Sequence, residues 1–397
     1  MARESEKGAL LLSMRKEKAT MIQKRIFKTS GCFFLILATV FLCLSPVSGD
    51  ARELAVMEFV DDTLEVSVVS AAKDESFVPY TREELRNLSV IPGGMAFGTK
   101  YQTEGLHVLG FSEENGESVA QEAGIKKKDL ILSCNGETLS SVERLSELVL
   151  ASGGKPIYLT CKRAGKKFTV KLQPKKNQEG DYQIGLLLQD SGAGIGTVTF
   201  ILPETLAFAG LGHGICDAET GSLIAMRSGV VLDVTVHDVK KGEAGDPGEL
   251  KGYFDPGVVG TLLGNATCGV WGVYDKLPAG AGTPVPVGLR EDLHEGDATI
   301  LCTTSERGVR PYAVKISSIS RGEAGSKCFT VTVTDPELLA RTGGIVQGMS
   351  GSPILQDGKL VGAVTHVLIN EPTVGYGIFL ENMLTHLPLC AKAQAAA

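Results

Sequence analysis

The feature that most constrains the fold is a series of short strand-like segments that begins near residue 182 and continues almost to the C-terminus. The segments are rich in β-branched residues and are separated by glycine-rich turns, a pattern typical of β-strands. They cover residues 196–202, 230–236, 312–319, 328–334 and 359–369. Helical periodicity is nearly absent until ENMLTHL at 381–387. Many short strands joined by turns predict a β-sandwich or a β-barrel.

Composition supports a folded, turn-rich β protein. Glycine makes up 48 of the 397 residues, about 12%, against roughly 7% in average proteins. Hydrophobic residues account for 43% of the chain and charged residues for 21%, which excludes a disordered or fibrous protein. Beyond residue 30 there are 31 basic and 43 acidic side chains. An acidic body argues against a nucleic-acid partner, because phosphate contacts need Lys and Arg.

The N-terminus has the pattern of a segment that targets the membrane. Residues 1–30 carry eight basic and three acidic side chains and are expected to stay in the cytoplasm. An uncharged stretch at 31–47 follows, with an apolar centre at 32–44 that is short for a spanning helix. We therefore expect residues 31–49 to be a signal peptide or a signal anchor, and the rest of the chain to be exported. Cleavage after the small residues at 47–49 and retention as an anchor both stay open.

The cysteines predict neither a disulfide framework nor a metal centre. Two of the nine lie in the apolar stretch, and the other seven are scattered without a C-x-x-C pair. We expect most of these to be small buried hydrophobic residues. His213 and Cys216 have H-x-x-C spacing, but no second pair completes a tetrahedral zinc site. The chain is expected to need no metal and no organic cofactor.

Composition shifts divide the exported part into three segments. A mixed, charged connecting segment covers residues 50–88 and contains a helix-like TREELRNL stretch at 81–88. A compact pattern of strands and helices at 89–178 predicts a first domain, and a polar run at 175–181 marks its end. The β-rich remainder at 179–397 is the second domain.

The first domain resembles a bacterial PDZ domain in AGI at 123–125, DLIL at 129–132 and NG at 135–136. This resemblance implies that it binds an extended peptide, often a C-terminus, by adding the peptide to a sheet edge. A glycine-rich loop is the candidate for capturing the peptide carboxylate on its backbone N–H groups. Its residues are Gly93, Gly94, Met95, Ala96, Phe97 and Gly98. The alternative is that these glycines only make a turn.

The strongest local pattern is Gly348-Met349-Ser350-Gly351-Ser352-Pro353, which an apolar strand follows. The flanking glycines let the backbone turn sharply and expose the Ser350 hydroxyl, while successive N–H groups converge on one point as an oxyanion hole requires. A serine hydroxyl is inert alone. The pattern therefore predicts a nucleophile that needs a base, and an acid to orient the base.

His213 is the favoured base because it lies between glycines in a turn after an apolar strand. His366 lies within VGAVTHVLI, where alternation makes it a packed residue beside the serine loop. For the acid, Asp335 ends a strand fifteen positions before the serine, while Asp217 and Asp357 are rivals. Asp357 and the glycine after it are better explained as a hairpin turn. Spacing alone does not separate Asp335 from Asp217.

Long ordered segments of the exported chain resemble the stage IV sporulation protein B (SpoIVB) family of serine peptidases. They are VIPGG at 90–94, GEAGDPGE at 242–249, TDPELLARTGGIVQGMSGSPI at 334–354, and GAVTHVLIN with GYGIFLENML at 362–384. The resemblance implies a mainly β fold, with a PDZ domain followed by a chymotrypsin-like double β-barrel serine peptidase domain.

The same resemblance implies a catalytic triad. His213 would be the base, Asp335 the orienting acid and Ser350 the nucleophile, with the N–H groups of Gly348 and Ser350 as oxyanion donors. Met349 departs from digestive relatives, which keep an Asp before the nucleophile, so activation by a buried new N-terminal amine is not expected. Ser352 replaces a Gly of their motif.

The resemblance also implies a signalling endopeptidase of endospore formation, exported from the forespore into the intermembrane space and either free or anchored in the inner forespore membrane. There it would cleave itself and then a membrane-embedded regulatory complex. Release of an intramembrane protease would then activate a late mother-cell sigma factor. Self-cleavage is expected within residues 50–90. Two alternatives stay open: a catalytically silent exported PDZ scaffold, and a general quality-control protease for exported proteins.

Overall fold

A computed structural model describes residues 56–60, 63–67, 80–112, 118–217, 221–322 and 325–386 of the chain. The chain divides into two compact units, and the boundary between them in the sequence follows residue 73. In the N-terminal unit, β1 (Val56–Val60) pairs antiparallel with β2 (Thr63–Ser67). The predicted basic segment and the membrane segment at 31–49 lie outside the described residues. None of the described helices is long and apolar enough to cross a membrane.

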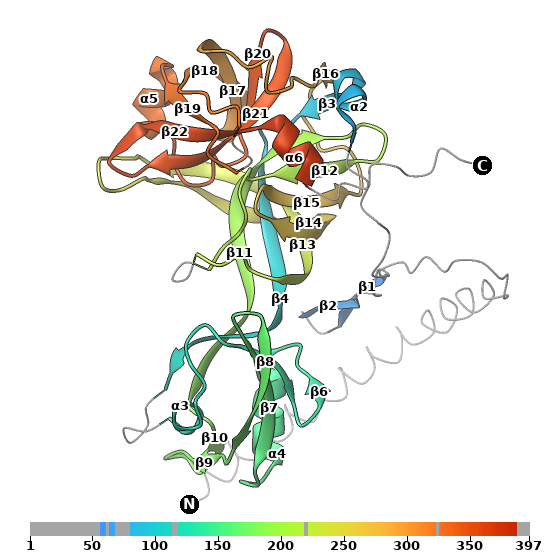
Figure 1. Cartoon of the computed structure of the whole chain (residues 1–397), viewed down its shortest axis with the longest axis vertical. Helices are drawn as coiled ribbons and strands as arrows, with labels where there is room; N and C mark the ends of the chain where they lie inside the picture. The colour runs from blue at the N-terminus through green and yellow to red at the C-terminus, as the bar shows by residue number, and fades with distance from the viewer. Residues whose placement is uncertain are drawn as a thin grey trace, which may run out of the picture. The chain divides into compact units, whose positions relative to one another are not determined.

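Six strands of the C-terminal unit pair in a closed ring, the first barrel (Figure 1). In ring order they are β4 (Ala96–Phe111), β11 (Leu186–Ile201), β12 (Ala207–Gly210), β15 (Gly269–Tyr274), β14 (Glu249–Ala266) and β13 (Met226–Lys240). β3 (Ser89–Pro92) extends this sheet from β11, and β16 (Val285–Pro286) pairs with β3. Phe97 and Phe208 meet edge to face in the barrel core, with ring centroids 5.7 Å apart.

A second closed barrel follows in the sequence. Its strands are β17 (Gly296–Thr303), β18 (Val309–Ser317), β19 (Phe329–Val333), β20 (Pro353–Gln356), β21 (Lys359–Leu368) and β22 (Glu371–Phe379). α5 (Pro336–Thr342) joins β19 to β20, and α6 (Leu380–His386) follows β22. Alternation drives this packing: Tyr312, Val314 and Ile316 of β18 are buried, while the residues between them face solvent. The predicted double β-barrel is thus confirmed.

The PDZ domain has its own hydrophobic core. Its remaining elements are α3 (Val119–Glu122), β5 (Leu130–Cys134), β6 (Glu137–Thr138), α4 (Val142–Ala151), β7 (Ile157–Arg163), β8 (Lys166–Leu172), β9 (Lys175–Lys176) and β10 (Tyr182–Gln183). Ser141 caps α4 by accepting the N–H of Arg144. Leu145 and Val149, one turn apart on α4, are buried in the core.

The PDZ domain is inserted between two strands of the first barrel. β4 and β11 pair from Phe111 opposite Leu186, in the PDZ domain, to Ala96 opposite Thr197, in the barrel. The structure therefore divides the chain differently from the predicted domain boundaries. Residues 89–104 belong with the barrel, and residues 182–188 belong with the PDZ domain, where Ile184 is buried in the core.

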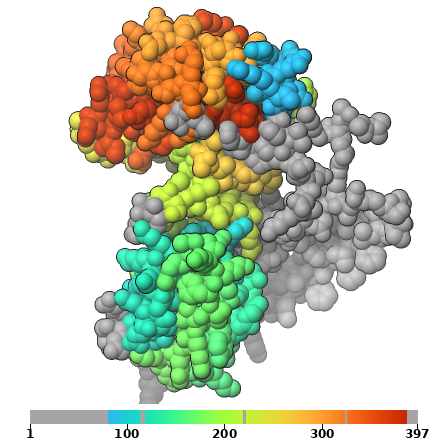
Figure 2. All heavy atoms as spheres, in the orientation of Figure 1, coloured from blue at the N-terminus to red at the C-terminus, as the bar shows by residue number. Residues whose placement is uncertain are grey.

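The predicted helix-like stretch at 81–88 forms α2 (Arg82–Asn87). Thr81 and Glu84 make a reciprocal capping box at its start. Leu85 is buried in a core that also contains second-barrel residues. Figure 2 shows this segment in blue against the orange surface of the second barrel. The end of the predicted connecting segment is therefore part of the double-barrel fold.

Candidate active site

The predicted nucleophile lies on the loop that joins α5 to β20 in the second barrel. The hydroxyl of Ser350 donates a hydrogen bond to the carbonyl of Thr365, 2.7 Å away on the neighbouring strand β21. This bond fixes the direction of the hydroxyl in the resting site. It must break before the oxygen attacks a substrate carbonyl.

The first barrel holds this loop through two threonines of β11. The N–H of Thr197 donates to the carbonyl of Ser350 at 3.0 Å, and its hydroxyl donates to the carbonyl of Gly348 at 2.7 Å. The buried hydroxyl of Thr199 donates to the carbonyl of Gly351 at 2.8 Å. These three bonds connect the barrels, so they fix the nucleophile loop at the junction between them.

The N–H groups of Gly348 and Ser350 make no hydrogen bond within the described part of the chain. The peptide that carries the Ser350 N–H is held from its other side. Its carbonyl, that of Met349, accepts the N–H of Ser352 at 3.0 Å and the Ser352 hydroxyl at 2.6 Å. Because the C=O and N–H of a trans peptide point in opposite directions, these bonds turn the Ser350 N–H away from Ser352. Two N–H donors beside a serine hydroxyl are what an oxyanion hole requires.

His213 lies on the first-barrel loop that follows β12. Its Nδ1 is 3.0 Å from the carbonyl of Gly214, and a carbonyl only accepts hydrogen bonds, so this nitrogen carries the proton. The lone pair then resides on Nε2, as a general base needs. Burial lowers the pKa of the imidazole below its usual value, and the bond to Gly214 opposes this effect. His213 is therefore neutral and able to accept a proton near pH 7.

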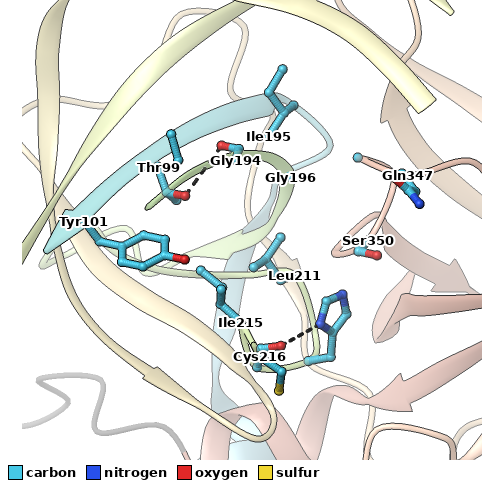
Figure 3. Close-up of a pocket in the computed structure, with 14 residues that line it drawn as sticks. Thr99, Tyr101, Gly194, Ile195, Gly196, Leu211, Ile215, Cys216, Gln347 and Ser350 are labelled. Atoms are coloured by element: carbon cyan, nitrogen blue, oxygen red, sulfur yellow. Dashed lines mark hydrogen bonds between the residues drawn. The ribbon is translucent and has the colours of Figure 1, made fainter. Parts of the chain in front are cut away.

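His213 and Ser350 line the same pocket, which has a volume of about 300 Å³. Gln347 and Gly348 belong to its wall, as do Thr99 and Tyr101 of the first barrel. Figure 3 shows Ser350 and Gln347 on the opposite side of the pocket from Thr99 and Tyr101. The structure thus brings together the base, the nucleophile and the first oxyanion donor that the sequence predicts.

Comparison with protein families gives the site a context. Residues 180–384, just over half of the chain, match the family described as SpoIVB peptidase S55. The chain belongs to this family. It is therefore a SpoIVB-type serine endopeptidase, and the resemblance found in the sequence is confirmed. Both barrels lie within the matched range, apart from the part of β4 that precedes the PDZ domain.

The S55 peptidase also contains a recognised PDZ domain, because residues 112–163 match the PDZ family. Among solved structures it is similar to the PDZ domain of the SdrC-like protein from Listeria monocytogenes. The two are 17% identical over 21% of this chain and 87% of that chain, with a TM-score of 0.19. A comparison with curated proteins found no match.

Asp335 does not meet His213 in this S55 peptidase. It caps α5, where one carboxylate oxygen accepts the N–H of Leu338 at 3.0 Å and the other accepts the N–H of Ala313 at 3.2 Å. In the described residues, no carboxylate contacts the ring of His213. The acceptor that orients the imidazole in the structure is the Gly214 carbonyl, and the catalytic role of Asp335 stays a prediction.

The two rival aspartates also lie away from the ring of His213. The carboxylate of Asp357 accepts a hydrogen bond from Nε2 of His294 at 2.8 Å. It occupies the turn between β20 and β21, where Asp357 and Gly358 have φ of 51° and 77°. This confirms the predicted hairpin turn. The N–H of Asp217 donates to Ser222, and its negative charge acts on His107.

His366 is the residue of the site that sequence reasoning undervalued. Its ring centroid lies 4.8 Å from that of His213, with an angle of 38° between the planes. Its Nδ1 is buried and has no hydrogen-bond partner in the described chain. Burial lowers the pKa of His366 to about 4, and the charge that His213 carries when it is protonated and the charge of Lys327 act in the same direction. Alternation along β21 indicated a packed residue beside the serine loop, but only the junction of the barrels reveals the contact with His213.

The described cysteines behave largely as predicted. Cys216 is exposed and lines the pocket, while five others are buried: Cys134, Cys161, Cys268, Cys302 and Cys328. Burial raises the pKa of the Cys161 thiol to about 11. Across the described ranges, no group of three or more His, Cys, Asp or Glu side chains is arranged to hold a metal ion.

The loop predicted to capture a peptide carboxylate is not part of the PDZ domain, and this prediction is wrong. The N–H of Gly93 donates to Thr199 at 2.9 Å, and the N–H of Gly94 donates to Val198 at 2.8 Å. Met95 accepts the N–H of Val198 at 3.0 Å, while Ala96, Phe97 and Gly98 begin β4 inside the barrel ladder. The loop packs in the first barrel, where its glycines let the backbones approach closely.

A different surface of the PDZ domain has the form of a peptide groove. A pocket of about 400 Å³ lies between α4 and the chain at 181–188. Leu150 and Leu187 line it and are 48% and 51% exposed. Here β11 pairs with β4 on one side only, so its other edge faces α4. The clue to this groove in the sequence is YQIGLLL at 182–188, where a glycine lies between apolar residues after a polar turn.

Proposed function

We propose that Ser350 is the nucleophile and His213 the base of this endopeptidase, because both line one pocket beside two N–H donors. Nε2 of His213 takes the proton of Ser350 as its oxygen bonds to the scissile carbonyl carbon. The N–H groups of Gly348 and Ser350 stabilise the oxyanion that forms. The C–N bond then breaks, the amine leaves with the proton from His213, and water hydrolyses the acyl-enzyme ester.

The biological role we propose is signalling during endospore formation. The exported peptidase cleaves itself and then a membrane-embedded regulatory complex, which frees an intramembrane protease to activate a late mother-cell sigma factor. Membership of the SpoIVB peptidase S55 family supports this role. The basic and apolar pattern at 1–49 supports export from the forespore and association with the inner forespore membrane.

We propose that the PDZ groove between α4 and the start of β11 recruits protein substrates, including other copies of this chain. An extended peptide would add a strand to the edge of β11 at Leu186–Leu188, with apolar side chains against α4. A Leu187→Glu protein is expected to lose affinity for C-terminal peptides at least tenfold. Equal affinity, measured by fluorescence anisotropy against a random C-terminal peptide library, would exclude this groove.

The decisive experiment compares full-length wild type with Ser350→Ala. Each protein is incubated with a fluorophosphonate probe, and intact mass is followed with time in a parallel sample without probe. We expect labelling and self-cleavage within 50–90 in wild type, and neither in Ser350→Ala. Labelling of both proteins would exclude Ser350 as the nucleophile, while labelling of neither would favour a catalytically silent scaffold.

The proposed role of Asp335 is tested by a substitution that keeps its helix-capping function and removes its negative charge. Asp335→Asn retains a good N-cap residue for α5 and removes the carboxylate. If the charge supports His213 during turnover, kcat falls by about 10³ to 10⁴ with little change in thermal stability. An activity within threefold of wild type would assign the residue to capping alone.

Sporulating cells that carry Ser350→Ala should fail to activate the late sigma factor if the signalling role is correct.

A further inference from the structure

The tip of the β13–β14 hairpin reaches from the first barrel onto the second. This hairpin tip, residues 241–250, carries the GEAGDPGE segment. The N–H of Gly242 donates to the carbonyl of Thr342, at the end of α5, at 2.8 Å. The N–H of Gly245 donates to the carbonyl of Ile369, beyond β21, at 2.9 Å. The tip is therefore docked on the second barrel at two places that flank the nucleophile loop.

The hairpin tip also brackets Gln347, the residue before the first oxyanion donor. The N–H of Gln347 donates to the carbonyl of Gly248 at 3.1 Å. The N–H of Leu250 donates back to the carbonyl of Gln347 at 2.8 Å. Glu249 and Gln347 thus form a parallel β-bridge that holds both sides of one residue.

The bond from Leu250 has a direct consequence for the oxyanion hole. The carbonyl of Gln347 and the N–H of Gly348 belong to the same peptide plane and point in opposite directions. Because Leu250 holds the carbonyl, the N–H of Gly348 is directed away from the hairpin tip. A flip of this peptide would set that N–H against the N–H of Leu250 and remove one oxyanion donor. The buried side chain of Leu250 also lies beside Gly348, only 3.1 Å from the point where a Cβ of that residue would be.

The nucleophile loop has a specific need for such a brace. Digestive relatives keep an Asp before the nucleophile, where its carboxylate pairs with a buried N-terminal amine. The residue at that position here is Met349, which is buried and has no carboxylate to make such a pair. We propose that the hairpin tip is a positioning element, which sets the Gly348 N–H for the oxyanion through its bridge to Gln347. This inference rests on the proposed nucleophile Ser350 and its proposed oxyanion donors.

Two glycines of the hairpin tip supply a matched pair of variants. Gly248 has φ of 66°, and a Cβ there would overlap the carbonyl oxygen of Lys240. Gly245 has φ of 90°, and a Cβ there would have no neighbour within 4 Å. Gly248→Ala and Gly245→Ala share the strain of a left-handed alanine. Only Gly248→Ala displaces the strand that bridges to Gln347.

The assay is the saturation kinetics of fluorophosphonate labelling on full-length protein, which separates probe binding from the rate of phosphonylation. We expect Gly248→Ala to lower the phosphonylation rate by ~10² to 10³, the range seen when one oxyanion donor is lost. The half-saturating probe concentration and the folded fraction should match those of Gly245→Ala. That variant retains the N–H of residue 245 and its bond to Ile369, so it should label within about threefold of wild type. A purely structural role would reduce the folded fraction instead of the rate.

Equal phosphonylation rates in the two alanine variants would overturn the inference while leaving the proposed nucleophile intact. If wild type fails to label, or Ser350→Ala labels as wild type does, the proposed function and this inference fail together. If Gly248→Ala does not fold, Leu250→Pro replaces it, because proline lacks the N–H that holds the Gln347 carbonyl. A labelling rate of Leu250→Pro equal to that of Gly245→Ala would then overturn the inference, and a slower rate at the same folded fraction would support it.

Discussion

Acid is expected to weaken the folded state through His366. The folded protein holds the pKa of this imidazole at about 4, while in an unfolded chain the pKa has its ordinary value of 6.5. Between these values the unfolded state binds more protons than the folded state, so the free energy of unfolding falls as the pH falls. The stabilisation is complete above 6.5 and is lost as the pH approaches 4. For this single group the loss at pH 5 is about 2 kcal/mol.

The change is measured by urea unfolding of the Ser350→Ala protein, which avoids self-digestion, at pH 7.5 and pH 5. The matched variant carries His366→Phe in the same background and has no imidazole to titrate at this position. Acidic and basic groups that do not interact with His366 contribute almost equally to both proteins, so they cancel in the comparison. We expect the protein that retains His366 to lose about 2 kcal/mol more than the variant over this interval. Equal losses would refute the buried, neutral state of His366.

Three further predictions concern hydrogen bonds and ion pairs that the structure describes. Thr197→Val removes the hydroxyl bond to Gly348 and should lower the labelling rate of the nucleophile several-fold, with a loss of about 1 kcal/mol in urea unfolding. Ser352→Ala removes the hydroxyl that holds the Met349 carbonyl and should have a similar effect on labelling, while probe affinity stays constant. Arg163→Met leaves the fully buried carboxylate of Asp129 without its bidentate partner, and the PDZ domain should lose about 3–5 kcal/mol by hydrogen exchange.

The fold was largely predictable from the sequence because alternating β-branched segments and turn residues are local signals. The double barrel and the PDZ domain follow from these patterns together with the family resemblance. The position of the loop at 93–98 was not predictable in this way. Its glycines permit either a carboxylate-binding turn or a close approach of two strands, and only tertiary packing against Thr199 and Val198 decides between them.

The candidate site was predictable in its residue types and less so in its contacts. The glycines beside Ser350 and His213 shape the local backbone that brings both residues to the pocket, and a sequence expresses such local geometry directly. The contact between the rings of His366 and His213 joins residues that are far apart in the sequence and belong to different barrels. The carboxylate of Asp335 has a local alternative, because an Asp followed by Pro336 is also a favourable helix start. Sequence spacing does not distinguish an orienting acid from a helix cap.

The insertion of the PDZ domain into the first barrel sets a constraint on the order of folding. Gln102 pairs with Ser191, and the 88 residues between them include the PDZ domain. Closing a flexible loop of that length costs about 4 kcal/mol of chain entropy at 25 °C. A PDZ domain that has already folded brings β4 and β11 together and removes most of this cost. The PDZ domain is therefore expected to fold first, and the first barrel is expected to form afterwards from strands that the folded PDZ domain already holds together.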